Sequence, residues 1–378
     1  MSSVDLVLTA SDSADAFFAE KVASFIQTLR DLEARISPEA EPVRGDAIHR
    51  ELEAAFLQSQ EDCRDFERGL AGDVEAVGAA QKRFREETEP WFGRSWIAHR
   101  ARTKPSGFAG DYEMLVKLYE MATPARGIGG YIDLCIMDLP LAQAVRARMV
   151  AARDFVLDEI AARTGDVRVL DIASGPCREY LNFPAMPSGR SLSVTAMDND
   201  TIALDYVSNT VVPQLPAGVT IRPVRYNAIR TRSADTTVEL FGRFDLIYSV
   251  GLCDYLTDEL LVGMLAAWHN TLAPGGTLYV AFKDMTRYNH APYQWHLDWF
   301  FFQRTHEDFL RLYRDAGFDV EGIRTTRDAT GIIINYVAGH DAQTHSRIDA
   351  AHAQPRRARQ PASVTWDAVQ TKSAAEQG

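Results

Sequence analysis

One stretch near the middle of the chain constrains its fold most. Residues 167–179 read VRVLDIASGPCRE: an apolar, β-branched run ends on Asp171, passes through a turn of small residues, and continues into a sequence that can start a helix. A strand of an α/β protein delivers its carboxyl end to a nucleotide-like ligand in this way. The stretch therefore predicts a cofactor loop between a strand and a helix.

The turn lacks the three alternating glycines of a pyrophosphate-binding loop. Gly175 is present, whereas Ala173 and Cys177 occupy the other two positions. Because the backbone must approach a diphosphate closely, the missing glycines favour a ligand without phosphate groups. Small-residue turns also occur in α/β proteins without any ligand, so a purely structural role stays open.

Predicted strands and helices alternate regularly after this turn. The strands are predicted at residues 194–198, 219–227, 244–249 and 277–282. Such alternation builds a parallel sheet with right-handed crossovers, whose ligands lie at the carboxyl ends of the strands. Residues 318–323 and 332–337 predict a closing antiparallel pair.

Two of these strands end on side chains that suit a nucleoside. Asp198 ends the second strand, where a carboxylate can accept hydrogen bonds from both ribose hydroxyls. Asn227 ends the third strand and could bind an adenine edge or close a turn. Their joint placement is more specific than either residue alone.

The chain before the cofactor loop is predicted to be helical. Apolar positions recur at helical spacing over residues 12–100, and a long helix is predicted from about Leu141 to Ile160. Between them, residues 104–115 (KPSGFAGDYEML) form a shaped loop with Asp111 as the N-cap of a helix. Whether this loop also contacts a ligand is open.

Aromatic residues crowd the segment 288–299 (YNHAPYQWHLDW), beside the fifth predicted strand. They could form a wall that excludes water and faces a cation such as a sulfonium. Aromatic residues at this spacing also pack in ordinary cores, so both interpretations stand.

Composition limits the class of protein. A length of 378 residues favours one large domain with an accessory region, and a formal charge of −12 argues against nucleic acid as a partner. The four cysteines form no CxxC pair, and no metal site is predicted. We expect a cytoplasmic protein without a membrane span, because neither a signal peptide nor a long apolar run is evident.

Over about residues 140–340 the chain resembles the class I S-adenosylmethionine-dependent methyltransferases. The resemblance is carried by LDIASG at residues 170–175, by Asp198 and Asn227, and by Pro-Gly-Gly at residues 274–276. It implies an α/β fold with a Rossmann-like seven-stranded sheet, mostly parallel with the last strand antiparallel. Residues 1–139 would then be a helical accessory or lid region, and residues 341–378 a disordered tail.

Three further segments resemble the branch that includes the 3-hydroxypalmitic acid methyl ester synthases. These segments are residues 104–105 with 110–113, residues 251–256, and residues 295–299 with 304–305. The resemblance implies S-adenosylmethionine as cofactor, bound by Asp171, Ala173, Ser174, Gly175, Asp198, Asn199, Asn227, Ala228, Ser249 and Gly251. It implies, for substrate and the closing wall, the residues Asp111, Tyr112, Asp254, Tyr255, Tyr288, Tyr293, Trp295 and Trp299.

The first functional hypothesis is methyl transfer to the carboxylate or amine of a small molecule. A carboxylate is ionised at neutral pH, whereas an amine must lose a proton to Asp254, Tyr255, His290 or His296. A second hypothesis is cyclisation of the cofactor to azetidine-2-carboxylate, which releases methylthioadenosine. A third is a ligand-binding protein without catalysis. No oligomeric state is indicated.

Overall fold

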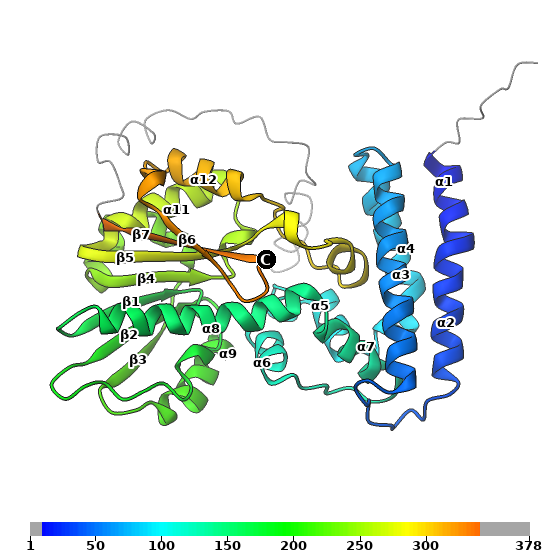
Figure 1. Ribbon diagram of the computed structural model, residues 1–378, viewed down its shortest axis with the longest axis horizontal. Coiled ribbons are helices and arrows are strands. Elements are labelled where there is room, and N and C mark those ends of the chain that lie inside the picture. Colours follow the sequence, from blue (N-terminus) through cyan, green and yellow to red (C-terminus); the bar gives the residue numbers. More distant parts are fainter. Residues whose placement is uncertain (1–9, 341–378) are drawn as a thin grey trace, which may run out of the picture.

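The computed structural model describes residues 10–340, which form a seven-stranded sheet and the helices around it (Figure 1). The strands are β1 (Val167–Ile172), β2 (Leu192–Asp198), β3 (Val219–Arg225), β4 (Phe244–Val250), β5 (Leu272–Lys283), β6 (Arg324–Arg327) and β7 (Ile333–Gly339). Their order is β3-β2-β1-β4-β5-β7-β6, with β1 to β5 parallel and β7 antiparallel to both its neighbours. The expected Rossmann-like seven-stranded sheet, mostly parallel with β7 antiparallel, is confirmed.

Helices cover the sheet and extend beyond it. They are α1 (Ala10–Phe17), α2 (Ala23–Glu33), α3 (Ala47–Gly69), α4 (Val74–Phe92), α5 (Trp96–Thr103), α6 (Tyr112–Glu120), α7 (Gly127–Met137), α8 (Pro140–Ala161), α9 (Thr201–Tyr206), α10 (Ala234–Phe241), α11 (Asp258–Thr271) and α12 (His306–Asp315). In Figure 1, α1 to α4 stand at one end of the molecule and α5 to α7 lie between them and the sheet. We call residues 10–137 the helical region.

Alternate side chains of the strands point to opposite faces of the sheet. Val169 and Tyr279 belong to the hydrophobic cluster that includes α8, whereas Leu170 and Phe282 belong to the cluster that includes α11 and α12. The α8 cluster continues into the helical region through residues such as Phe84. Because one core runs through both parts, the proposed boundary at residue 139 stays a prediction.

The strand order reverses direction at β1. The chain runs from β1 to β2 and β3 on one side and returns to β4 on the other side of β1. Ligands of open α/β sheets bind in the crevice at the carboxyl ends of strands where the order reverses in this way. The predicted cofactor loop, directly after β1, lies at that point.

Two predicted element boundaries were wrong. Residues 318–323, predicted as a strand, contain the 3-10 turn Val320–Gly322, and the edge strand β6 follows it. Phe318 and Ile323 are buried in the hydrophobic cluster that includes α12, whereas the four residues of β6 are exposed and carry no alternating pattern. β5 begins at Leu272, before the Pro-Gly-Gly turn, although its strand was predicted from residue 277. The predicted disordered tail, 341–378, lies outside the described residues.

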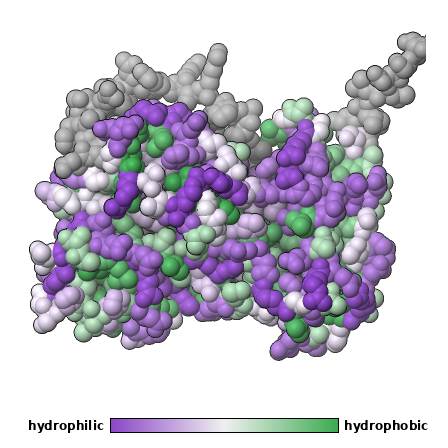
Figure 2. Space-filling model, viewed as in Figure 1, coloured by the Kyte–Doolittle hydropathy of each residue, from purple (hydrophilic) through white to green (hydrophobic). Residues whose placement is uncertain are grey.

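Polar residues cover most of the face in Figure 2, with hydrophobic residues in small patches between them. Within residues 10–340, no single helix is long and apolar enough to cross a membrane; α7 and α8 together pass on length and composition alone, with a 60° bend between them.

The helical region contains a buried carboxyl that should make stability depend on pH. Asp133 of α7 is fully buried and accepts hydrogen bonds from the Ser95 hydroxyl (2.5 Å) and the Ile97 backbone N–H (3.0 Å). Burial raises the pKa of Asp133 from 3.8 to about 6. The folded chain thus keeps a proton that the unfolded chain has already lost, so the free energy of unfolding falls as pH rises through this window, by about 3 kcal/mol.

Asp133→Asn should remove this contribution. We expect the difference in unfolding free energy between wild type and variant, measured with urea, to change by about 2 kcal/mol between about pH 4 and about pH 7. The same difference at both pH values would contradict the assignment.

Candidate functional site

The loop after β1 has the backbone shape of a glycine loop although two glycines are missing. Ala173, Gly175 and Cys177 have φ angles of 57°, 53° and 48°, so three alternate residues are left-handed. For alanine and cysteine this conformation costs roughly 1–2 kcal/mol each. The strand β2 holds the loop, because Ser174 N donates to the Met197 carbonyl (3.0 Å) and Gly175 N donates to Asp198 Oδ2 (2.8 Å). The side-chain oxygen of Ser174 is buried without a hydrogen-bond partner among the described residues.

Asp198 lies beside this loop, at the carboxyl end of β2. Its Oδ2 accepts from Gly175 N and its Oδ1 accepts from Asp200 N (2.9 Å). Burial raises the pKa of Asp198. Each carboxylate oxygen has a second lone pair, so both can still accept a hydroxyl from a ligand.

The other predicted cofactor residues lie around the same edge of the sheet. The Ser249 hydroxyl donates to the Ile172 carbonyl (3.0 Å) and joins β4 to β1. Asn227 is exposed and its side chain accepts from Ile229 N (2.9 Å), so it closes the turn that begins at Ala228. Asn199 is exposed. These positions fit a rim around the loop.

Two acids lie close together below the loop, Asp171 buried and Glu179 half-buried. The Tyr248 hydroxyl donates to Glu179 Oε1 (2.7 Å), and Cys177 Sγ donates to Asp171 Oδ2 (3.6 Å). Burial, together with the charge of Glu179, raises the pKa of Asp171 well above its usual range, and burial also raises the pKa of Glu179. Such a pair creates a negative potential that a cationic ligand group would relieve.

A second polar cluster lies at the ends of β4 and β5. The ammonium of Lys283 and the carboxylate of Asp254 form an ion pair, and Lys283 N donates to Asp254 Oδ1 (3.1 Å). Both side chains are buried, with 5% and 1% of their surface exposed. Burial lowers the pKa of Lys283, as does the nearby charge of Arg148.

Arg148 of α8 adds a second cation to this cluster. It is 5% exposed, and Tyr119 is a hydrogen-bond partner. Among residues 10–340 it forms no ion pair with a carboxylate, and its Nε lacks a hydrogen-bond partner. Its guanidinium lies against Gly251, where a Cβ would be 2.8 Å from Nη2. Arg148 thus lacks a carboxylate partner of its own among the described residues, and a buried cation of this kind is costly unless an anion balances it.

Tyr255 and Trp299 border this cluster. The indole Nε1 of Trp299 donates to the Tyr255 hydroxyl (2.6 Å), and burial raises the pKa of Tyr255 to about 12. The Lys283 ammonium lies 5.6 Å from the Tyr255 ring centroid and 4.7 Å from that of Phe301. Tyr288 packs on Phe301 with ring centroids 6.1 Å apart. Tyr293 packs on both Phe301 (6.3 Å) and Tyr288 (6.1 Å). The structure therefore brings five predicted substrate residues together: Asp254, Tyr255, Tyr288, Tyr293 and Trp299.

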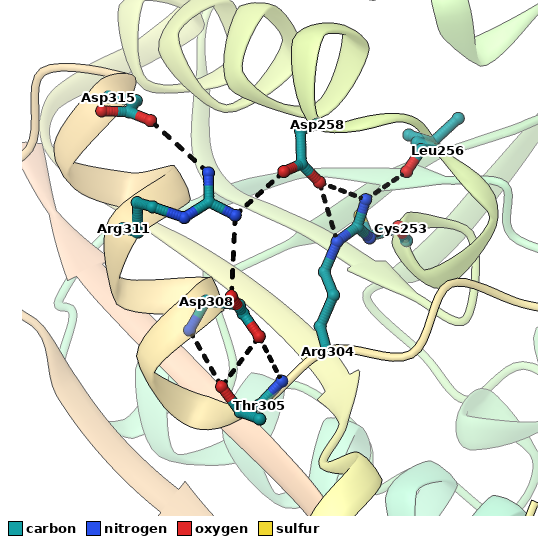
Figure 3. A network of polar contacts seen from close by, with 8 residues as sticks. All are labelled: Cys253, Leu256, Asp258, Arg304, Thr305, Asp308, Arg311 and Asp315. Carbon is teal, nitrogen blue, oxygen red and sulfur yellow. Dashed lines mark hydrogen bonds and ion pairs between the residues drawn. The ribbon is translucent and has the colours of Figure 1, made fainter. Parts of the chain in front are cut away.

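A network of polar contacts made by Arg304 and Arg311 fixes the segment that carries Asp254 and Tyr255 (Figure 3). Arg304 donates to the carbonyl oxygens of Leu256 (2.6 Å) and Cys253 (3.3 Å) and to Asp258 Oδ1 (2.8 Å). Arg311 of α12 binds the other oxygen of Asp258 (2.9 Å). A buried arginine that binds two carbonyls and a carboxylate holds such a turn firmly.

The structure does not bring the other predicted substrate residues to this cluster. Trp295 is fully buried against the helical region and donates to Glu67 Oε2 (2.9 Å). Asp111 caps α6. Tyr112, also on α6, packs against Tyr206 with ring centroids 5.8 Å apart.

Both candidate histidine bases contact residues of the helical region. His290 Nε2 is 2.9 Å from Glu67 Oε1. His296 is fully buried among phenylalanine rings and bonded to Ser59 (3.1 Å), and burial lowers its pKa well below the usual range. Neither is placed to take a proton from a substrate at Lys283.

Sequence reasoning missed Arg148, Glu179 and Lys283. A lysine that ends the apolar run YVAF was a usable signal, since charged residues rarely end a buried strand without a role. Arg148 gave no such signal, because an arginine in a long helix is usually exposed.

No protein-family model matches the chain, and no curated protein matches it. Its fold is similar to that of a possible exported protein from Bordetella parapertussis, with a TM-score of 0.50 and 16% identity over 90% of this chain and 99% of that chain. The CurJ carbon methyltransferase matches with a TM-score of 0.44 and 11% identity, over 88% and 93% of the two chains. Magnesium protoporphyrin IX methyltransferase from Synechocystis PCC 6803 matches with 0.39 and 13%, over 53% and 86%. At sequence identities this low, the similarity is evidence for the fold alone.

Proposed function

We propose that the chain is an S-adenosylmethionine-dependent methyltransferase that acts on the carboxylate of a small-molecule acceptor. The residues at the sheet edge fit the cofactor. Asp198 has lone pairs for ribose hydroxyls, and the Asp171 and Glu179 pair suits an α-ammonium group. The loop needs no phosphate partner, as its sequence already indicated. Bound S-adenosylmethionine would supply the methyl group together with its leaving group.

The buried cations Arg148 and Lys283 favour a carboxylate over an amine as the acceptor. An amine acceptor must lose a proton, and none of the four predicted bases is suited to take it. Asp254 is paired with Lys283, the pKa of Tyr255 is raised to about 12, and both histidines lie elsewhere. A carboxylate is already ionised and would balance the surplus positive charge. Carboxylate methylation also agrees with the branch that the sequence resembles.

In this mechanism the protein mainly orients its acceptor. Arg148 offers a planar donor group and Lys283 a point charge, so together they would hold the carboxylate near the cofactor loop. Trp299, Tyr255 and Phe301 exclude water from the Lys283 side. Holding the nucleophile in line with the methyl carbon is the larger catalytic contribution.

Mass spectrometry tests the proposal. The purified chain is incubated with methyl-deuterated S-adenosylmethionine and a panel of carboxylic acids and amines. We expect deuterated methyl esters and S-adenosylhomocysteine. Methylthioadenosine without a methylated product would instead indicate cyclisation, and no product together with no cofactor binding would indicate a different ligand.

Asp198→Ala should weaken cofactor binding by about 1–3 kcal/mol, or roughly 5- to 150-fold in Kd, because the ribose hydroxyls lose their acceptor. Calorimetric titration with S-adenosylhomocysteine measures this change. Asp200→Ala, which removes a neighbouring acid that caps α9, is the control. An unchanged affinity for Asp198→Ala would exclude the ribose assignment.

A further inference from the structure

The carboxylate of Asp298 links the helical region to the acceptor cluster. Asp298 has a φ angle of 53°, a left-handed conformation that aspartate tolerates better than most residues. Its Oδ1 lies 3.0 Å from Arg85 Nη2 of α4, and its Oδ2 lies 2.5 Å from Lys104 Nζ, just after α5. Two cations from the helical region thus fix the orientation of the residue before Trp299.

The position of the Trp299 indole in turn determines the position of the Tyr255 hydroxyl. Because the indole N–H donates to the Tyr255 oxygen, the phenol's own hydrogen is free to donate to another group. Gly110, in the loop before α6, holds the indole from the other side: a Cβ there would lie 2.6 Å from Trp299 Cζ2. The Tyr255 hydroxyl is therefore held in one position, on a ring whose centroid lies 5.6 Å from the Lys283 ammonium and which lies near the charge of Arg148.

We infer that Asp298 is a positioning residue for the acceptor: held by Arg85 and Lys104, it fixes Trp299 and so aims the Tyr255 hydroxyl at the acceptor's carboxylate. This inference rests on the proposed function. It gives the helical region a direct part in acceptor binding, because the two cations that hold Asp298 come from α4 and the end of α5.

The surrounding segment does not depend on Asp298 for its fold. Arg85 Nη1 donates separately to the Gln294 carbonyl (2.8 Å), and Arg102 Nε donates to the His296 carbonyl (2.9 Å). Trp299 N donates to the Tyr293 carbonyl (2.8 Å). Loss of the Asp298 charge should therefore loosen the direction of the indole and leave the segment folded.

The test combines Asp298→Asn with Tyr255→Phe. Asparagine keeps the size and tolerates the left-handed backbone, but it loses the charge that binds two cations. We expect Asp298→Asn to raise KM for the carboxylate acceptor roughly tenfold, with the Kd for S-adenosylhomocysteine and the unfolding midpoint unchanged. The double variant should be no worse than Tyr255→Phe alone, because both changes remove the same hydrogen bond.

Glu87→Gln is the matched control, since it breaks an ion pair with Arg83 on the same helix α4 that does not involve Asp298. Effects of Asp298→Asn and Tyr255→Phe that add, an unchanged acceptor KM, or a parallel loss of cofactor affinity would each overturn the inference while the methyltransferase proposal stands. No methylated product from the wild-type chain would overturn both.

Discussion

Replacing Arg148 by methionine is expected to lower kcat/KM for a carboxylate acceptor by about 100-fold or more. Removing one partner of a buried, hydrogen-bonded charge pair costs about 2–5 kcal/mol or more. Arg148 is 5% exposed and forms no ion pair within residues 10–340, so a bound carboxylate would be its charge partner. Methionine keeps much of the side-chain volume and removes the charge. Steady-state kinetics with varied acceptor concentration measures the loss.

Two further variants make this result specific. Arg148→Lys should have an intermediate effect, because lysine keeps the charge and loses the planar pair of donors. Arg163→Met removes a guanidinium just after the same helix, where it pairs with Glu159 and contacts the Gly275 carbonyl. We expect its kinetics to match wild type. Equal kinetics for Arg148→Met and Arg163→Met would contradict the carboxylate assignment.

Asp254→Ala is expected to lower the free energy of unfolding by about 3–5 kcal/mol. The change leaves the Lys283 ammonium buried without its carboxylate, and an uncompensated buried charge has a cost of this size. It also removes the acceptor of the Lys283 backbone N–H at the end of β5. Denaturant unfolding followed by circular dichroism measures the loss.

The double variant Asp254→Ala with Lys283→Met identifies the cause. Because the unpaired charge is then absent, most of the stability should return even though the ion pair is lost. A double variant that is less stable than Asp254→Ala would show that the ion pair itself, and not the uncompensated charge, determines the effect.

The sequence was sufficient to predict the sheet and the edge of it at which the candidate cofactor residues lie. The apolar run before Asp171 and the acid Asp198 mark strand ends, and ends of parallel strands meet at one edge. The glycine count was a poor guide to the loop's shape. Ala173 and Cys177 adopt left-handed backbone because β2 binds the loop, and a contact with a neighbouring strand is not visible in a local motif.

In the aromatic segment 288–299, residue spacing does not predict which side chains lie together. Trp295 and Trp299 are four residues apart, yet one packs with Phe17 and Phe66 in the helical region and the other contacts Tyr255. Between them the chain leaves the π-helical turn Pro292–His296 and passes through the left-handed Asp298, which changes its direction. Spacing predicts a shared face only while the backbone stays regular.

The central claim is that an adenosyl group lies along the carboxyl ends of β1, β2 and β4. A crystal structure of the protein grown with saturating S-adenosylhomocysteine tests it most directly. We predict the ribose hydroxyls within hydrogen-bond distance of Asp198, and the amino acid portion beside the Asp171 and Glu179 pair. Density for the ligand at another surface, or an edge of the sheet that stays filled by the protein's own side chains at saturation, would contradict the claim.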